Sequence, residues 1–239
     1  MDYLKAIEQR VSIRSYLGTG IDKDKLSVLI DEIEGGNKKY GLSISFLEDG
    51  SNAFNTFGKS YGMFKGVRSL IVMKGPINDI HLKEKLGYVG EKVILKATAL
   101  GLGTCWVGGT FERQNPIFEV SEGEELVCVI TIGTAADKKS LIGNVMGKIK
   151  RSKAAEAFYS SDKAVPAWFT AGISAVQKAP SAKNSQKVQF SYKDGIVRAG
   201  VPDSYRFDLV DLGIAKFHFE LAAGGSFNFG NNGEYQKSQ

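Results

Sequence analysis

Two arginines flank a serine near the start of the sequence, in Arg10-Val11-Ser12-Ile13-Arg14. Two guanidiniums around a hydroxyl can grip a phosphate, because arginine stays ionised and offers a planar fork of donors. They can also place a fixed positive charge against a second acceptor. A solvated basic turn has the same pattern, and the motif taken alone favours that turn.

A second candidate is the glycine-rich segment 101–109, which reads Gly-Leu-Gly-Thr-Cys-Trp-Val-Gly-Gly. It lacks the dinucleotide-binding fingerprint, because Trp106 stands where the third glycine belongs and the segment follows a predicted helix rather than a strand. A helix C-cap explains its first two glycines. Gly108 and Gly109 suit the approach of bare backbone N–H groups to a flat ligand, although an ordinary turn competes with this interpretation.

The third candidate is the polar stretch Ala-Pro-Ser-Ala-Lys-Asn-Ser-Gln at 179–186. Pro180 stops a preceding helix, and Ser181, Asn184 and Gln186 can close local side-chain turns. The same polar set can clasp a ribityl chain and the edge of a ring. Taken alone, the stretch predicts a turn.

The first half of the chain supplies clear elements around these residues. Asp22 can cap a helix whose apolar face contains Leu26, Leu29, Ile30 and Ile33, and Gly35-Gly36 is predicted to stop it. Residues 42–48 alternate as a strand, whereas 69–74 and 126–133 are typical of buried strands. Between these two lies an amphipathic helix with the apolar stripe Val89, Val93, Ala97 and Leu100, and it leads into the glycine-rich segment.

The order of elements repeats after Pro166. A helix over 167–178, a loop over 179–187, a hairpin over 188–201 and a long helix over 207–223 are predicted. Setting Gly213 on Gly90 aligns the two long helices. The sequence therefore predicts a duplicated chain with a first half at 1–159 and a shorter second half at 160–239, joined by a short polar linker at 160–166.

Composition limits the class of protein. The 239 residues are 43% hydrophobic and 24% charged, which suits one globular unit or two small fused ones. A net charge of +5 favours an anionic small ligand over nucleic acid. Two cysteines and two histidines exclude a disulfide framework and a four-ligand zinc site, and Cys105 is expected to pack rather than react. With no signal peptide or long apolar run, the expected location is the cytoplasm, away from membranes.

Together the three segments resemble signatures of the nitroreductase superfamily of FMN-dependent oxidoreductases. That resemblance implies an α+β class: a three-layer α/β/α fold with a mixed, mostly antiparallel sheet and two related halves. Two departures stand out. Residues 34–40 occupy the place where the family's Ala-Pro-Ser loop usually lies, and Lys187-Val188 replaces an aromatic start to the following strand.

Family members are homodimers in which each FMN takes contacts from both subunits. Here the arginines and the glycine segment occur only in the first half, and the Ala-Pro-Ser loop only in the second. The resemblance therefore implies a monomeric, single-chain pseudo-dimer with one flavin site.

Carried over to this sequence, the resemblance assigns roles to individual residues. Arg10 and Ser12 would bind the FMN phosphate and lower ribityl chain, Arg14 would face N1, and the Gly109 N–H would face N5. Arg151 resembles a late basic residue at the phosphate, although a solvated basic run explains it equally well. The remaining residues expected around the flavin are Trp106, Gly108, Pro180, Ser181, Ala182, Asn184 and Gln186.

The implied activity is reduction of nitroaromatics, quinones or similar acceptors by NAD(P)H, through ping-pong hydride transfer at flavin N5. No catalytic side chain or metal is required, because the flavin carries the chemistry. Two alternatives stay open. One is a flavin-binding sensor or storage protein without efficient turnover, and the other is a binder of nucleic acid or nucleotide phosphate.

Overall fold

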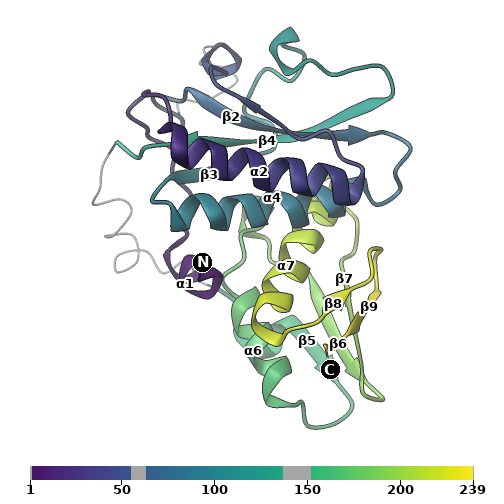
Figure 1. The fold of residues 1–239 in the computed structure, drawn as a ribbon. Coiled ribbons are helices and arrows are strands. Elements are labelled where there is room, and N and C mark those ends of the chain that lie inside the picture. The colour runs from purple at the N-terminus through teal and green to yellow at the C-terminus, as the bar shows by residue number, and fades with distance from the viewer. Residues whose placement is uncertain (1, 55–62, 137–151, 239) are drawn as a thin grey trace. The chain divides into compact units, whose positions relative to one another are not determined.

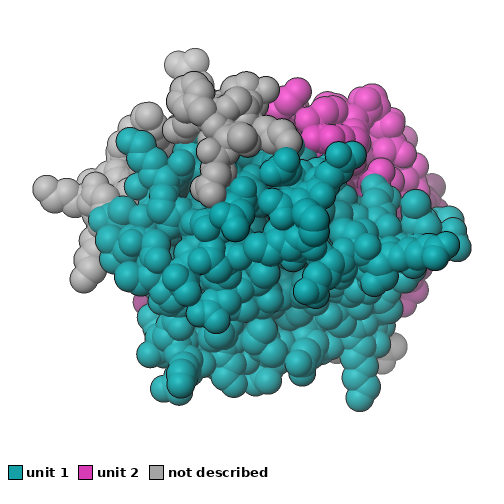
Figure 2. All heavy atoms as spheres, turned by 90° about the horizontal axis from the view of Figure 1, so that it is seen from above, with its two compact units in different colours: residues 1–2, 9–82, 93–149 teal, residues 3–8, 83–92, 150–239 magenta. Residues whose placement is uncertain are grey.

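The computed structural model of the protein describes residues 2–54, 63–136 and 152–238. The chain divides into two compact units, shown in different colours in Figure 2. Unit 1 contains residues 1–2, 9–82 and 93–149, and unit 2 contains residues 3–8, 83–92 and 150–239. Residues 83–92 of the helix α4 (Leu82–Ala99) thus belong to unit 2, and the rest of the helix belongs to unit 1.

Helix α2 (Lys23–Tyr40) begins as the sequence predicts and ends later. The Asp22 carboxylate accepts hydrogen bonds from the N–H groups of Asp24 and Lys25, which confirms the predicted cap. The predicted stop at Gly35-Gly36 is wrong, since the helix continues to Tyr40. A glycine inside a helix costs only about 1 kcal/mol, and the helix ends at Gly41, which has the left-handed φ of 67°.

Unit 1 contains a four-stranded antiparallel sheet in the order β1-β2-β4-β3 (Figure 1). The strands are β1 (Ser45–Leu47), β2 (Ser69–Pro76), β3 (Gly103–Val107) and β4 (Glu124–Gly133). The predicted strands at 42–48, 69–74 and 126–133 are confirmed. Strand β3 was not predicted, because the glycine-rich segment contains it. Two short 3₁₀ turns, η1 (Ser51–Phe54) and η2 (Pro116–Phe118), lie in the connections.

Unit 2 contains a five-stranded sheet in the order β5-β6-β7-β9-β8. Its strands are β5 (Tyr159–Ser161), β6 (Gln189–Lys193), β7 (Ile196–Gly200), β8 (Ser226–Phe227) and β9 (Gly233–Gln236). Only the β5–β6 pair is parallel. The predicted β6–β7 hairpin is confirmed, and Asp194-Gly195 forms its turn with φ values of 52° and 83°.

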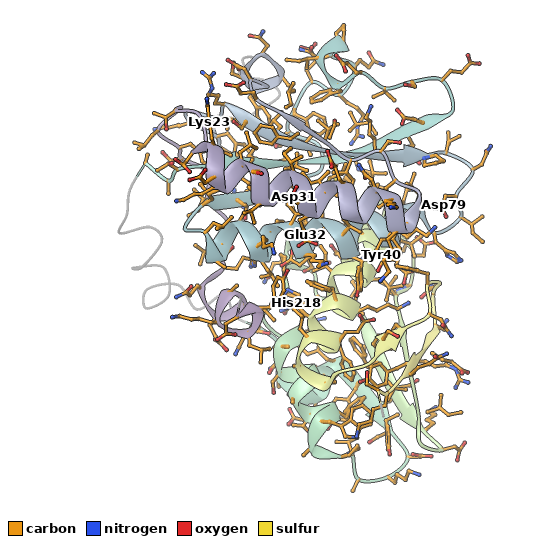
Figure 3. The ribbon with its side chains drawn as sticks, in the orientation of Figure 1. Lys23, Asp31, Glu32, Tyr40, Asp79 and His218 are labelled. Atoms are coloured by element: carbon orange, nitrogen blue, oxygen red, sulfur yellow. The ribbon has the colours of Figure 1, made fainter. Side chains whose placement is uncertain are left out.

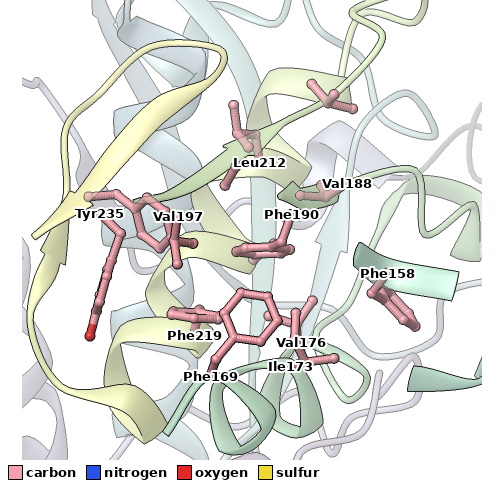
Figure 4. Packing of buried hydrophobic residues seen from close by; sticks show 14 residues of the cluster. Phe158, Phe169, Ile173, Val176, Val188, Phe190, Val197, Leu212, Phe219 and Tyr235 are labelled. Carbon is pink, nitrogen blue, oxygen red and sulfur yellow. The ribbon is translucent and has the colours of Figure 1, made fainter. Parts of the chain in front are cut away.

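Two helices, α6 (Ala167–Val176) and α7 (Asp208–Ala223), pack in unit 2 and confirm the predicted helices there. Figure 4 shows their apolar side chains meeting those of the sheet. Phe219 of α7 stacks on Phe190 of β6 with ring centroids 5.0 Å apart. Gly172 of α6 permits this contact, because a Cβ at that position would lie 2.5 Å from the Phe219 ring.

The α+β class with mostly antiparallel strands is therefore confirmed, with the strands divided between two sheets. The other helices of the described residues are short: α1 (Tyr3–Gln9), η3 (Ala155–Phe158) and η4 (Ala182–Asn184). None of the described helices combines the length and the apolar character that crossing a membrane requires.

Candidate functional site

In unit 1 the arginine segment pairs with the first residues of β3. Ser12 forms a parallel bridge with Thr104, and the Ile13 N–H donates to the Thr104 carbonyl at 2.9 Å. Gly103 makes this close approach possible, because a Cβ there would lie 2.8 Å from the Ile13 side chain. The backbone that carries Arg10, Ser12 and Arg14 is therefore fixed against the sheet.

Tyr16 anchors the same segment from the other side. Its hydroxyl donates to the Ile13 carbonyl at 2.6 Å and lies 2.8 Å from Thr131 Oγ1. Burial raises the pKa of the Tyr16 phenol far above its usual range, so the group stays neutral. The Tyr16 N–H also donates to the Lys65 carbonyl at 2.9 Å. Sequence reasoning missed Tyr16, since two of its partners, Lys65 and Thr131, are distant in the chain.

The two arginines differ in exposure. Arg10 is 9% exposed, whereas Arg14 is exposed to solvent. Among the described residues, no carboxylate forms an ion pair with Arg14. Its backbone is held by the Lys65 N–H, which donates to the Arg14 carbonyl at 2.9 Å. The Arg14 guanidinium is therefore an exposed positive charge, carried on a held backbone, that can meet an anionic ligand.

Beyond the end of β3, Gly108 and Gly109 form a bend. The Gly108 carbonyl accepts from Arg113 Nη2 at 2.8 Å, and Arg113 also donates to the carbonyls of Leu126 and Val127. Arg113 thus ties the glycine bend to β4, a role that the sequence did not suggest. Trp106, the strand residue before Val107, is half-buried and opposite Ile130 of β4.

The arginine segment and the glycine bend lie at opposite ends of β3. Gly108 lies four positions after Thr104 along extended chain, a distance of about 13 Å. A ligand that engages both ends must carry its anionic group on a chain some distance from a flat ring. The donor set in unit 1 therefore fits an elongated phosphorylated ligand.

In unit 2 the loop 179–187 holds an unusual backbone. Lys183, Asn184 and Gln186 have φ values of 55°, 55° and 48°, in the left-handed region that favours glycine. Each such residue costs roughly 1 to 3 kcal/mol, with asparagine at the low end, and persists only where the surroundings impose it. Strain of this kind is typical of functional loops.

Two side chains, those of Ser181 and Asp211, hold this backbone through hydrogen bonds. Ser181 Oγ accepts from the Gln186 N–H at 3.0 Å, and the Ala182 N–H donates to both carboxylate oxygens of Asp211 at 2.9 and 3.0 Å. Asp211 is 4% exposed. Burial raises the pKa of Asp211 to about 7; the like charge of Asp208 adds to the rise and the Lys187 ammonium opposes it.

Gln186 supports the base of the loop with its whole side chain. Its Oε1 accepts from the Lys153 N–H at 3.1 Å, and its Nε2 donates to Ser152 Oγ at 3.1 Å. Gln186 is 7% exposed and Pro180 is buried, whereas Asn184 is exposed and Ser181 and Ala182 are half-buried. The exposed side of the loop therefore consists of residues 181–184.

The remaining candidate residues do not add side chains to the two segments described above. Arg151 lies outside the described residues. His218, labelled on α7 in Figure 3, is fully buried, with Nε2 3.0 Å from Glu91 Oε1 and Nδ1 3.1 Å from the Ala175 carbonyl. Cys105 and Cys128 are buried free thiols. Within residues 2–54, 63–136 and 152–238, no group of three or more side chains could hold a metal ion.

Comparisons with known proteins point to one family. The family described as "Putative TM nitroreductase" matches residues 2–223. A solved structure titled a putative nitroreductase from Thermotoga maritima is 20% identical, with 98% of this chain and 92% of that chain covered and a TM-score of 0.64. This likeness shows a shared fold.

Smaller matches include a nitroreductase with bound FMN from Bacteroides fragilis, which is 18% identical. The alignment with that structure covers 57% of this chain and 89% of that chain, with a TM-score of 0.46. No curated protein matches the sequence.

Proposed function

We propose that this chain, which belongs to the nitroreductase family whose model matches residues 2–223, is an FMN-dependent oxidoreductase. It takes hydride from NAD(P)H and reduces nitroaromatics, quinones or similar acceptors in two half-reactions. The observation that carries the proposal is the arrangement along β3, where a fixed arginine segment and a bare glycine bend lie at opposite ends of one strand.

The residues of unit 1 fit FMN by their chemistry. FMN carries a phosphate at the end of a ribityl chain and a flat ring at the other end. Arg10 and Ser12 supply a guanidinium and a hydroxyl for the phosphate. Gly108 and Gly109 present backbone without side chains, which lets a ring approach closely.

The loop 179–187 of unit 2 carries the other residues that we propose bind FMN. The loop residues Ser181, Ala182 and Asn184 lie on its accessible side. The strained backbone of the loop is held in one conformation by hydrogen bonds. A preorganised loop binds its ligand without the entropic cost of ordering. Gln186 and Pro180 act from beneath, where they fix the shape of the loop.

FMN, when bound, supplies the electron chemistry, so the side chains have to bind, orient and exclude water. Arg14 provides a fixed positive charge for the pyrimidine part of the ring, where reduction leaves negative charge. The N–H of Gly109 can donate to the ring edge. His218 is buried and engaged at both nitrogens, so it is not placed to donate a proton to a substrate, and solvent can deliver the proton.

One chain binds one FMN, because the two sets of residues each occur once. A contact within unit 2 supports the underlying duplication. In the alignment that sets Gly213 on Gly90, Gly87 falls on Val210. These two residues meet, since a Cβ on Gly87 would lie 2.1 Å from the Val210 carbonyl oxygen. Contact between equivalent residues is what a two-fold relation places on its axis.

Titration of the purified protein with FMN, followed by NAD(P)H oxidation with a nitroaromatic or a quinone, tests the proposal. We expect saturable flavin binding and oxidation that depends on the acceptor. Arg14→Ala should lose part of its flavin binding and part of its NAD(P)H oxidation. Arg198→Ala, which removes a surface arginine paired with Glu234, should keep both activities. Flavin binding without turnover would favour the sensor or storage protein, and absence of flavin binding would refute the assignment.

A further inference from the structure

We propose that Asp211 is a positioning residue for the loop 179–187, and that flavin affinity falls when its carboxylate takes up a proton. The inference rests on the proposed function, because it names the group that holds the flavin loop in its binding conformation. Asp211 lies in the first turn of α7, far from the loop in the sequence.

The contact is specific to the point where the loop turns. Both Asp211 oxygens accept from the Ala182 N–H, at 2.9 and 3.0 Å. Ala182 opens the 3₁₀ turn η4, and the two residues that follow it, Lys183 and Asn184, have positive φ. Fixing the Ala182 N–H therefore fixes the chain as it enters the strained conformation.

The surroundings of Asp211 make the charge of its carboxyl group sensitive to pH. A small cavity lies behind the loop, and Asp211 is the only ionisable residue among the described residues that line it. The others are Phe158, Val176, Ala179, Pro180, Ser181, Gln186, Val188 and Ala215. They come from η3, α6, the loop, the segment leading to β6, and α7 itself. An apolar lining of this kind disfavours the charged form of a carboxyl group.

Two charged groups act on Asp211. Asp208, one turn earlier on α7, is fully buried and disfavours a second negative charge. Lys187, at the end of the loop, favours that charge, but its ammonium already lies 3.1 Å from both carboxylate oxygens of Asp208. Together with burial, which raises the pKa most, and the Ala182 hydrogen bond, which lowers it, these charges give Asp211 a pKa of about 7.

The ionisation of Asp211 determines the strength of the hydrogen bond that holds the loop. Above about pH 7 the carboxylate accepts a charge-assisted hydrogen bond from Ala182, and below it a neutral carboxyl accepts a bond roughly half as strong. The loop is then held less firmly at low pH. The Ala182 hydrogen bond lowers the pKa of Asp211 and is therefore strongest in the ionised form, whereas burial raises the pKa and favours the neutral form. Because burial has the larger effect, the contribution of Asp211 to the free energy of global unfolding has the opposite trend and is lost as the pH rises through about 7.

The experiment measures the FMN dissociation constant from pH 5.5 to 8.5 for the full-length protein and for Asp211→Asn. The FMN phosphate itself titrates near pH 6, so the readout is the ratio of the two constants at each pH. Asparagine keeps the size and an acceptor oxygen but cannot ionise. We expect the variant to bind roughly three- to tenfold more weakly at pH 8 and the ratio to approach one at pH 6.

The matched control is Asp194→Asn, which changes an exposed aspartate in the β6–β7 turn. It should follow the unaltered protein at every pH. A second readout needs no flavin: hydrogen exchange of the Ala182 amide in the flavin-free protein at pH 8 should be faster in Asp211→Asn and unchanged in Asp194→Asn.

A ratio that does not change with pH, or an unchanged Ala182 exchange rate in Asp211→Asn, would overturn the inference. Failure of the unaltered protein to bind FMN at every pH would overturn the proposed function instead. In that case the exchange rate alone decides whether Asp211 positions the loop.

Discussion

Two segments carry the residues proposed to bind flavin, and they are held in place by different physics. Residues 10–17 of unit 1 are fixed by backbone pairing with β3 and by the neutral phenol of Tyr16. The loop 179–187 of unit 2 is fixed by a buried carboxylate, Asp211. The first kind of support does not change its protonation between pH 5 and 9, whereas the second does. We therefore expect the arginine side to act as a constant anchor and the loop side to respond to pH.

The largest effect on flavin binding is expected from Arg14→Ala, which removes an exposed charge without an ion-pair partner among the described residues. A hydrogen bond to a charged group contributes about 1.5 to 3 kcal/mol, so FMN should bind roughly ten- to a hundredfold more weakly at all pH values. The bound flavin should also become harder to reduce, as its reduction potential will show. A potential equal to that of Arg198→Ala would remove Arg14 from this role.

Next comes Gly103→Ala, which tests the backbone pairing itself. The new Cβ would lie 2.8 Å from the Ile13 side chain, and overpacking of this kind costs about 1 to 3 kcal/mol. Denaturant unfolding should show that loss, together with weaker FMN binding. Gly20→Ala is the control, because a Cβ at Gly20 meets no atom within 4 Å. Equal stability of the two variants would contradict the account of the arginine segment.

Tyr16→Phe should have a moderate effect. It removes the hydroxyl that donates to Ile13 and pairs with Thr131 but keeps the packed ring. We expect a loss of about 1 kcal/mol in the free energy of unfolding and FMN binding weakened a few-fold. The comparison predicts that this loss is the same at pH 6 and pH 8. A pH-dependent loss would mean that the two segments are not supported independently.

The smallest effect is a shift in the pH response of the loop. Asp208→Asn removes the like charge that raises the pKa of Asp211. The pKa of Asp211 should therefore fall, and the pH at which FMN affinity declines should fall with it. Measuring the FMN dissociation constant across pH gives that midpoint. A midpoint that moves upward would show that Asp208 acts mainly by holding Lys187.

Local sequence patterns predicted the local elements well. The cap at Asp22, the hairpin turn at Asp194-Gly195 and the long helix α7 each depend on neighbours in the chain, and each is present. The end of α2 was misplaced, because Gly35-Gly36 tolerates helix and the deciding left-handed residue is Gly41.

The contacts that hold the candidate site in place could not be predicted from the sequence, because they join residues that are distant in the chain. Tyr16 meets Thr131, 115 positions away, and Asp211 meets Ala182, 29 positions away. Arg113 appears in the sequence as an ordinary charged residue, and only the fold shows that it joins Gly108 to β4. Such contacts depend on which strands and helices become neighbours, and spacing along the chain does not carry that information.

The most direct test of the account is the stoichiometry of FMN binding at a known molecular mass. Titration of the protein with FMN, with the mass measured by light scattering, should give one FMN per chain at the 26.0 kDa mass of a single chain. Two FMN per chain, or one FMN per chain seen only in a dimer, would contradict the claim that the arginine segment and the Ala-Pro-Ser loop of one chain serve a single flavin.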